Sequence, residues 1–256
     1  MKLVLALLAV ATLATQSGCV TGRRFITPAV PKGPATAVTK GAVYISVVTD
    51  NRVFQNKPSD PSVPSVDGDA NSLSPAQKDQ MIGRQRNGYG KAMGDIGLAG
   101  NDTVTKQVRR LVEEGFRQRG YEISGDPAAP TTASVSVKEF WAWGTPGFFA
   151  LSFEVKLSTT LTVKDEHGMR QAVVTGYGLN HGQVAKDGNW LEAFEPAFEK
   201  YLSNFSSELD RTVVQPAAKP GGDLYTELKR LDELRRDNIL SEEEFQAQKK
   251  KLLEKN

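Results

Sequence analysis

The stretch "FALSFEVKLSTTLTVKDEHGMRQAVVTGYGL", residues 149–179, carries the clearest secondary-structure pattern in the chain. In its first half, apolar and polar side chains alternate, as in a β-strand with one buried and one solvated face. Asp165–Gly168 then supplies a hairpin turn, beyond which a second extended run returns. The apolar or β-branched members of the returning run are Val173, Thr175, Tyr177 and Leu179. The stretch therefore predicts two long antiparallel strands joined by a tight turn.

Elements on either side of this hairpin complete one domain. Alternating residues predict a strand from residue 41 and another over Ala133–Phe140. Between these strands, an apolar stripe with helical spacing follows Asn101, which can cap the helix, and Gly120 marks its end. After the hairpin, a second stripe predicts a closing helix, in which Pro196 either introduces a kink or begins the regular part. The order strand, helix, three-strand meander and helix predicts an α+β domain, an antiparallel sheet with helices on one face.

Two polar or glycine-rich segments interrupt this pattern. Residues 56–79 contain four prolines with many Ser and Asp, a composition that buries little apolar surface, and we expect a disordered surface insertion there. The next stretch, "MIGRQRNGYGKAMGDIGLAG", has six glycines. It is not a phosphate-binding Walker loop, because Gln85 and Ala92 occupy two positions that this loop requires. We expect its glycines to serve turns and close backbone approaches.

The first residues have the features of an export signal. Residues 3–13 form an uncharged apolar run that is too short to span a bilayer, which takes about 20 residues as a helix. Small residues then precede Cys19, and together these features resemble the lipobox of bacterial lipoproteins. The resemblance implies that residues 1–18 are removed and that the Cys19 sulfur receives a diacylglyceryl group. Because Gln16 stands where the lipobox usually has an aliphatic residue, an ordinary signal peptide with an incidental cysteine remains the alternative.

The segment that follows Cys19 predicts the position of the domain relative to the membrane. Residues 19–40 contain three prolines among small residues, and we expect a lipidated, extended tether that holds the domain off the membrane surface. Val20 in place of aspartate implies sorting to the outer membrane, on its periplasmic face, or to the cell membrane in a host that lacks an outer membrane. The lipid is the only anchor that we expect, and no other cofactor is expected.

The central region has a family resemblance. The string "VTKQVRRLVEEGFRQRGYEIS", followed by "ASVSVKEF", the long hairpin and the closing helix, resembles the YajG-like family of bacterial lipoproteins. The resemblance covers residues 41–213 and depends on a helix that ends in Arg-Gly-Tyr before a strand, together with the order of elements. It implies a location in the cell envelope and no particular chemistry.

The C-terminal region has a second, closer resemblance. A linker over residues 214–223 precedes two short amphipathic helices in residues 224–256, the second opened by a capping box of Ser241 and Glu244. The string "LDELRRDNILSEEEFQAQKKKLL" resembles the SHOCT (short C-terminal) domain, which implies oligomerisation or contact with a partner. The residues that we expect to mediate this contact are Leu228, Leu231, Leu234, Ile239, Leu240, Phe245 and Leu252. A self-contained solvated hairpin is the alternative interpretation.

The sequence contains little that indicates chemistry. Removing residues 1–18 takes one lysine from the 32 basic residues and none from the 30 acidic ones, so the balance gives no electrostatic argument for nucleic-acid binding. The two histidines, His167 and His181, are not part of a zinc-ligand pattern, and no serine elbow is visible. We therefore predict no metal site, no catalytic site and a protein that is not an enzyme.

A cluster of aromatic residues offers the best candidate for ligand contact. In "FWAWGTPGFF", Trp141, Trp143, Phe148 and Phe149 surround a Gly-Pro bend, where they either fill the end of the sheet or contact a ligand, glycan or membrane. We expect a membrane-anchored envelope lipoprotein with a structural or interaction role, which forms homo-oligomers or binds another envelope protein. The alternative is a periplasmic lipid- or glycan-binding lipoprotein that assists transport and uses the aromatic bend.

Overall fold

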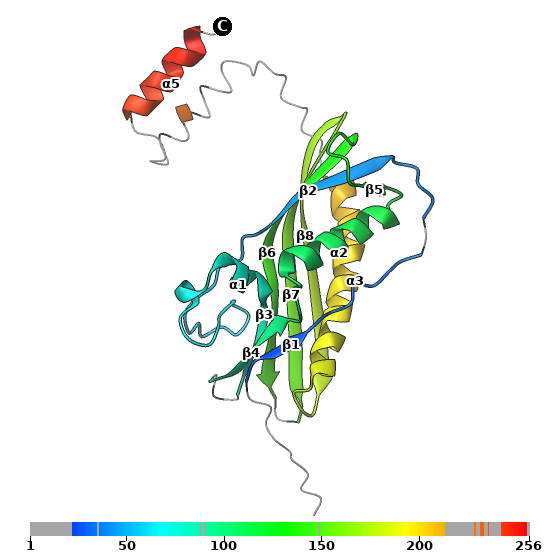
Figure 1. Ribbon diagram of the computed structural model, residues 1–256, viewed down its shortest axis with the longest axis vertical. Coiled ribbons are helices and arrows are strands. Elements are labelled where there is room, and N and C mark those ends of the chain that lie inside the picture. The colour runs from blue at the N-terminus through cyan, green and yellow to red at the C-terminus, as the bar shows by residue number, and fades with distance from the viewer. Residues whose placement is uncertain are drawn as a thin grey trace, which may run out of the picture.

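The computed structural model contains one eight-stranded sheet with two long helices packed on one face (Figure 1), which confirms the predicted α+β class. It describes residues 22–34, 36–87, 89, 91–147, 149–212, 228, 231, 232, 235 and 242–254. The strands are β1 (Arg24–Ile26), β2 (Ala42–Asp50), β3 (Met81–Arg86), β4 (Ala92–Leu98), β5 (Glu122–Ser124), β6 (Thr131–Pro146), β7 (Leu151–Asp165) and β8 (Gly168–Gly182). The helices are α1 (Pro75–Gln80), α2 (Val104–Gln118), α3 (Asp187–Arg211) and α5 (Glu242–Glu254), with a 3-10 turn at Ala70–Ser72.

The sheet is mixed rather than wholly antiparallel. Strands β6, β7 and β8 form the predicted antiparallel meander, and the β7–β8 hairpin closes with Asp165 opposite Gly168. Two earlier strands lie on the other side of β6 and run parallel to it, β2 along its first half and β3 along its second half. Long connections that include α2 lead from these strands to β6, and crossovers of this kind produce parallel pairs.

Helix α3 packs on β7 and β8 at very short range. Two glycines of β8 permit this approach, since a Cβ atom on Gly176 would lie 2.3 Å from the Ala197 carbonyl oxygen and one on Gly178 would lie 2.1 Å from that of Ala193. The helix is continuous through Pro196, so the regular helix does not begin there. β8 is the predicted returning strand, but its core-facing row includes the two glycines. Val173, Tyr177 and Leu179 lie on the opposite, exposed side.

Helix α2 is confirmed with a different cap. The Thr103 hydroxyl, not Asn101, accepts the capping hydrogen bond from the Lys106 amide. Gly120 has φ +83° just after the helix, as its predicted role requires. The apolar faces of α2 and α3 meet the sheet in one core, where Phe116 packs edge-on against Phe205 at 5.1 Å.

The segment expected to be a disordered insertion, residues 56–79, is instead folded over the second half of β6. Val66 and Ala70 are buried with Trp141 and Trp143 in a separate cluster on the face of the sheet away from α3. The expectation was wrong because composition counts only the apolar residues of the segment itself. Here the strand supplies two large apolar side chains that the segment covers, and their burial offsets the entropy of ordering.

The tether predicted over residues 19–40 is wrong for its described part, residues 22–34 and 36–40. β1 pairs in parallel with β4, and the Gly33 amide donates a hydrogen bond to Glu114 of α2. Further on, the amides of Thr39 and Lys40 both donate to the Gly120 carbonyl. The described part of this segment therefore lies against the domain and does not lead away from it.

The glycine-rich stretch forms a β-hairpin, β3–β4, beside β6. Its glycines serve the close approaches that were predicted, since a Cβ atom on Gly83 would lie 2.6 Å from the Ala142 carbonyl oxygen. The strands themselves were missed. Their glycines and arginines disrupt the apolar alternation by which a strand is recognised.

Candidate functional site

The residues predicted as sites lie in three places. Cys19 lies outside the described residues. In the C-terminal hairpin, Leu234, Ile239, Leu240 and the side chain of Leu252 also lie outside them, whereas Leu228 and Leu231 are half-buried. Phe245 of α5 is buried, and the Arg235 guanidinium lies 4.8 Å from the centre of its ring. Arg235 also pairs with Asp232 and Glu242, so these side chains join the two helical parts of the hairpin.

The two tryptophans of the predicted aromatic bend lie within strand β6 and not in a bend. β6 continues to Pro146, and a β-bulge between Val137 and Glu139 shifts the alternation of its faces. Trp141 and Trp143 are therefore 1% and 7% exposed beneath residues 52–80, the connection between β2 and β3 that is here called the 52–80 segment. The Trp141 indole donates to the Pro61 carbonyl over 3.2 Å. They fill the structure and are not available to a ligand.

The other two residues of that string lie near the β6–β7 turn. Phe149 is 83% exposed. Phe148 lies outside the described residues. Of the two interpretations given for the four aromatic residues, filling the end of the sheet fits the tryptophans, and surface contact stays a prediction for Phe149.

A cleft of about 580 Å³ lies between the 57–68 segment and the β3–β4 hairpin. Four basic side chains and one carboxylate line it: Lys57, Arg84, Arg86, Lys91 and Asp67. Tyr89 stands at its rim with 98% of its surface exposed. Such a concentration of cations around a hollow is typical of a site for anionic groups.

The deepest cation of the cleft is only partly satisfied by the protein. The Arg84 side chain is buried, its Nη1 donates to the Val66 carbonyl, and its Nη2 lies 3.3 Å from Asp67. Its Nε has no hydrogen bond, although it lies 3.6 Å from the buried carboxylate of Asp95. The Arg84 guanidinium thus interacts with two carboxylates, the buried Asp95 and the exposed Asp67, which lines the cleft.

Arg86 shows the local excess of positive charge. Its Nη1 donates to the Pro58 carbonyl over 2.7 Å. Burial, and then repulsion from Arg84, lowers the pKa of the Arg86 guanidinium. Lys57 adds a third charge from a strained position, since it is the only non-glycine among the described residues with positive φ, at 49°. An anion in the cleft would relieve the repulsion between these groups.

Sequence reasoning missed this cleft. The string that contributes Arg84, Arg86 and Lys91 was interpreted from its glycines, as turns and close approaches in place of a phosphate-binding loop, and not from its basic residues. A signal was present, because two arginines two residues apart share one face if the segment is a strand. The contribution of Lys57 depends on the folding of the 56–79 segment, which its composition did not predict.

No catalytic arrangement emerges from the described residues. The Ser152 hydroxyl lies 3.3 Å from Nδ1 of His181 at an exposed position, and within the described part of the chain no third side chain orients the imidazole. Among the described residues no group of three His, Cys, Asp or Glu could hold a metal ion. The described helices include none with the length and apolarity to cross a bilayer.

Comparison with known proteins identifies the hairpin alone. Residues 226–253 match the model of the SHOCT family, the short C-terminal domain, which confirms the interpretation of that region. No curated protein matches the chain. The YajG-like resemblance of the central domain stays a prediction.

Two solved structures are similar to the larger part of the chain. An uncharacterized protein is 9% identical over 73% of this chain and 95% of its own, with a TM-score of 0.34. A protein from Xanthomonas campestris, described by the family model DUF330, is 14% identical over 73% of this chain and 92% of its own, with a TM-score of 0.37.

Proposed function

We propose that this chain is a lipid-anchored protein of the bacterial cell envelope with a non-catalytic role. In this role the α+β domain is a spacer and the SHOCT hairpin contacts a second copy of the chain or another envelope protein. The lipid is attached at Cys19, and the domain lies in the periplasm of a cell with an outer membrane. The proposal combines the lipobox-like sequence, the SHOCT match and the layout of the domain.

The observation that carries the proposal is that the two ends of the chain leave the domain at opposite ends. Gly22, next to the proposed anchor, hydrogen-bonds to Met93 at the beginning of β4. α3 begins near that end, runs back along β8 and ends at Arg211, where Asp210 pairs with Arg119. A helix of 25 residues is about 37 Å long. The hairpin that follows α3 is therefore connected to the side of the domain that is remote from the anchor.

The small apolar core of the hairpin supports a role in binding another protein surface. Its described core is small, consisting of the half-buried Leu228 and Leu231 and the buried Phe245, with Arg235 stacked on the ring. A helical pair of this size has too little apolar core to be stable alone and is completed by another surface. Attachment by a linker at the far side of the domain gives it access to such a surface.

The anchor is tested by intact mass and membrane fractionation of the wild type and Cys19→Ser. We expect the wild type to carry a diacylglyceryl group and to sediment with membranes, whereas the variant remains unlipidated and is released or unprocessed. An unlipidated, soluble wild type would refute the anchor and leave the hairpin proposal standing.

The hairpin is tested by cross-linking and by the mass of the detergent-solubilised protein. Phe245→Ala removes the buried ring, and we expect loss of the larger species, whereas Gln246→Ala changes an exposed neighbour and keeps it. Monomeric wild type without a cross-linked partner would contradict the interaction role.

The alternative, lipid or glycan binding at the aromatic bend, has lost two of its four expected contacts. Trp141 and Trp143 are covered by the 52–80 segment and would reach a ligand only if that segment were displaced.

A further inference from the structure

Several turns of the domain gather at the end where the chain enters it. β3 and β6 are parallel, so the β3–β4 and β6–β7 turns follow the same edge of the sheet. Leu151 of β7 pairs with Gly182 of β8, which brings the β8–α3 connection to this edge as well. β1 runs parallel to β4, so Gly22 lies beside the beginning of β4. This end, here called the entry end, is the lower end of the domain in Figure 1.

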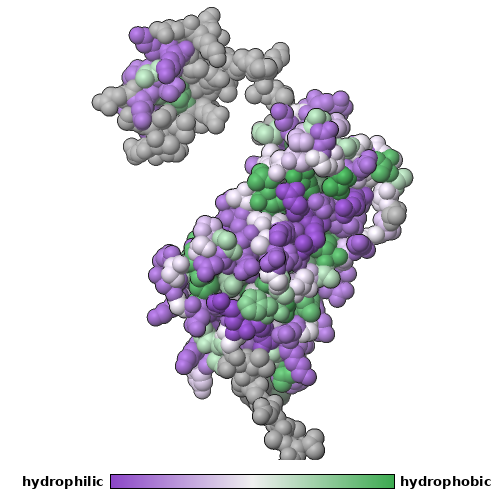
Figure 2. Space-filling model, viewed as in Figure 1, coloured by the Kyte–Doolittle hydropathy of each residue, from purple (hydrophilic) through white to green (hydrophobic). Residues whose placement is uncertain are grey.

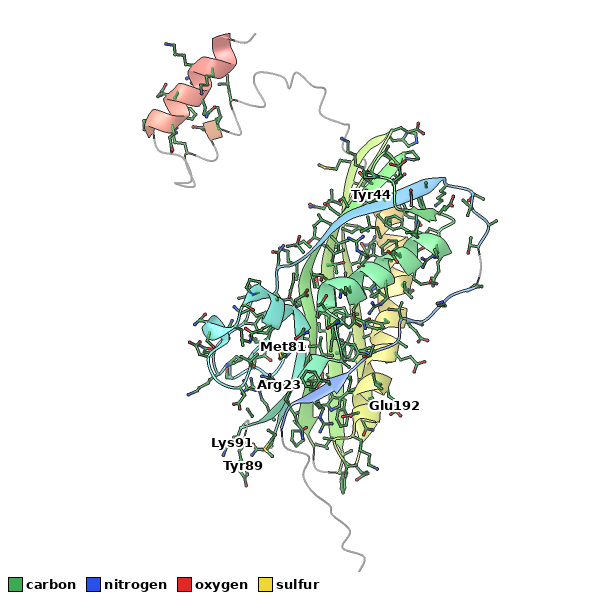
Figure 3. All side chains as sticks on the ribbon, in the orientation of Figure 1. Arg23, Tyr44, Met81, Tyr89, Lys91 and Glu192 are labelled. Carbon is green, nitrogen blue, oxygen red and sulfur yellow. The ribbon has the colours of Figure 1, made fainter. Side chains whose placement is uncertain are left out.

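The entry end combines exposed apolar and basic side chains. Tyr89, Phe149 and Val184, one from each turn, are 98%, 83% and 52% exposed. Arg23 next to β1, Lys57 and Lys91 are exposed, the two lysines beside Tyr89 at the cleft, and Lys186 adds a fourth cation in the β8–α3 connection. Figure 3 shows Tyr89 and Lys91 together at the tip of the β3–β4 hairpin, with Arg23 beside β1. Figure 2 shows a domain surface that is mostly hydrophilic, with hydrophobic areas in several places, including its upper part.

The path from the proposed anchor to this end is very short. Three peptide units separate Cys19 from Gly22, and consecutive Cα atoms are about 3.8 Å apart, so the two residues are at most about 11 Å apart. Gly22 cannot move away from the sheet without loss of contacts. Its amide donates to Met93 over 2.8 Å, and its backbone packs so closely on Gly94 that a Cβ there would lie 1.9 Å from the Gly22 oxygen.

We propose that the entry end is a membrane-docking surface for anionic phospholipid, in which Lys57, Lys91 and Arg23 neutralise headgroup phosphates while Tyr89 and Phe149 enter the interface. The proposal rests on the lipid anchor at Cys19, because that anchor is what holds this end at the bilayer. It reverses the expectation of a tether that keeps the domain off the membrane.

The chemistry of the entry end suits lipid headgroups. Tyrosine concentrates at the membrane–water interface, where its apolar ring and its hydroxyl are both solvated, and phenylalanine is found among the side chains that enter the apolar side of this interface. Each basic residue near an anionic surface strengthens binding about fivefold. The cleft behind Lys57 and Lys91 contains Arg84 and Arg86, whose mutual repulsion a phosphate group would reduce.

Three acidic side chains near this end each lie close to an arginine. Asp95 is buried between Arg84 and Arg23, and Asp187 pairs with Arg24. Asp67 is exposed at the cleft and lies 3.3 Å from Arg84. Among the described residues Lys57 and Lys91 have no ion pair, and Arg23 shares the Asp95 carboxylate with Arg84, so this end keeps an excess of positive charge for a partner.

The test uses the mature polypeptide, residues 19–256, with Cys19→Ser, so that no acyl chain contributes to binding. The described fold begins at Gly22 and keeps all its described contacts in this polypeptide. Its co-sedimentation is measured with phosphatidylcholine vesicles that contain or lack phosphatidylglycerol. We expect preferential binding to the anionic vesicles, and a loss of at least about 25-fold for Lys57→Glu with Lys91→Glu, from two residues of about fivefold each.

A matched control reverses two exposed lysines elsewhere, Lys138→Glu with Lys164→Glu, with the same change in net charge. Binding that is retained by the control and lost by the entry-end variant supports the proposal, provided that circular dichroism shows both to be folded. Equal loss in both variants, or no preference of the parent for anionic vesicles, overturns it. The proposal is also overturned, in favour of a small-anion site, if inorganic phosphate displaces the polypeptide from the vesicles and sodium chloride at the same ionic strength does not.

The outcome is independent of the anchor test. Cys19 is absent from the polypeptide used, so its vesicle binding does not depend on lipidation. Membrane fractionation of the native chain tests the anchor without reference to Lys57 or Lys91. Failure of one experiment therefore leaves the other result interpretable.

Discussion

Replacement of Arg52 by methionine should release the 52–80 segment from the sheet. The Arg52 side chain is fully buried, and each of its five N–H groups has an acceptor. Two bonds go to the Asp50 carboxylate, at 2.8 and 2.7 Å. The other three go to the carbonyls of Met81, Phe140 and Lys78, at 2.6, 2.9 and 2.8 Å. One side chain thus holds both ends of the segment to β6.

The magnitude follows from what methionine leaves behind. Removing one partner of a buried ion pair costs about 3–5 kcal/mol, because the other charge, here Asp50 at 12% exposure, keeps its desolvation penalty. The guanidinium also lies 5.2 Å from the centre of the Phe54 ring, a contact of about 1 kcal/mol. Methionine keeps the apolar stem and recovers part of the packing. We expect a net loss of about 4 kcal/mol, a large share of the 5–15 kcal/mol that stabilises a typical domain.

Tryptophan fluorescence and limited proteolysis report this change directly. Two of the three tryptophans, Trp141 and Trp143, are covered by the segment, so its release should shift their emission to longer wavelength and permit cleavage between residues 52 and 80. Arg110→Met is the control. It removes an arginine that is 46% exposed and pairs with Asp102, and such surface pairs contribute less than about 1 kcal/mol. If Arg52→Met changes emission and unfolding free energy no more than this control, Arg52 does not hold the segment.

Three further changes test other contacts of the fold. Gly178→Ala should lower the unfolding free energy by about 2 kcal/mol or more in urea denaturation, because its Cβ overlaps α3, whereas Gly188→Ala, with nothing within 4 Å, should be neutral or stabilising. Tyr201→Phe should cost about 1–2 kcal/mol in the same assay, since its fully buried hydroxyl lies 2.6 Å from that of Thr159. Although its side chain is 48% exposed, partial desolvation, and then the hydrogen bond that its hydroxyl donates to Glu154, raises the pKa of Tyr177 to about 12 from the ordinary 10.0. The stabilisation that neutral Tyr177 provides is therefore complete below pH 10 and lost as the pH rises to 12, so the unfolding free energy should fall further over this range in the wild type than in Tyr177→Phe.

The sequence predicted those parts of the fold that depend on local periodicity. The long hairpin and α2 follow from alternation, helical spacing and turn residues within short windows. The faces of the strands were harder to assign. In β8 the exposed row contains Val173 and Leu179, while the core row contains two glycines, because proximity of α3 leaves no space for side chains.

The remaining differences arise from contacts between distant segments. The parallel pairing of β2 and β3 with β6 joins residues that are far apart in the sequence, and no local pattern indicates it. The orientation of Trp141 depends on a bulge after Val137, which reverses the alternation from that point. The candidate cleft was missed for the same reason, since Lys57 reaches Arg84 only when the polar segment folds over those tryptophans.

The 52–80 segment thus links stability to the proposed membrane surface, and the two roles can be separated. The segment supplies Lys57 and one wall of the cleft, and Arg52 holds it in place. Arg52→Met should therefore reduce binding to anionic vesicles together with the unfolding free energy. Lys57→Glu with Lys91→Glu should reduce vesicle binding alone, because both side chains are exposed. Vesicle binding that survives release of the segment would place the lipid contacts on the β3–β4 and β6–β7 turns without the cleft.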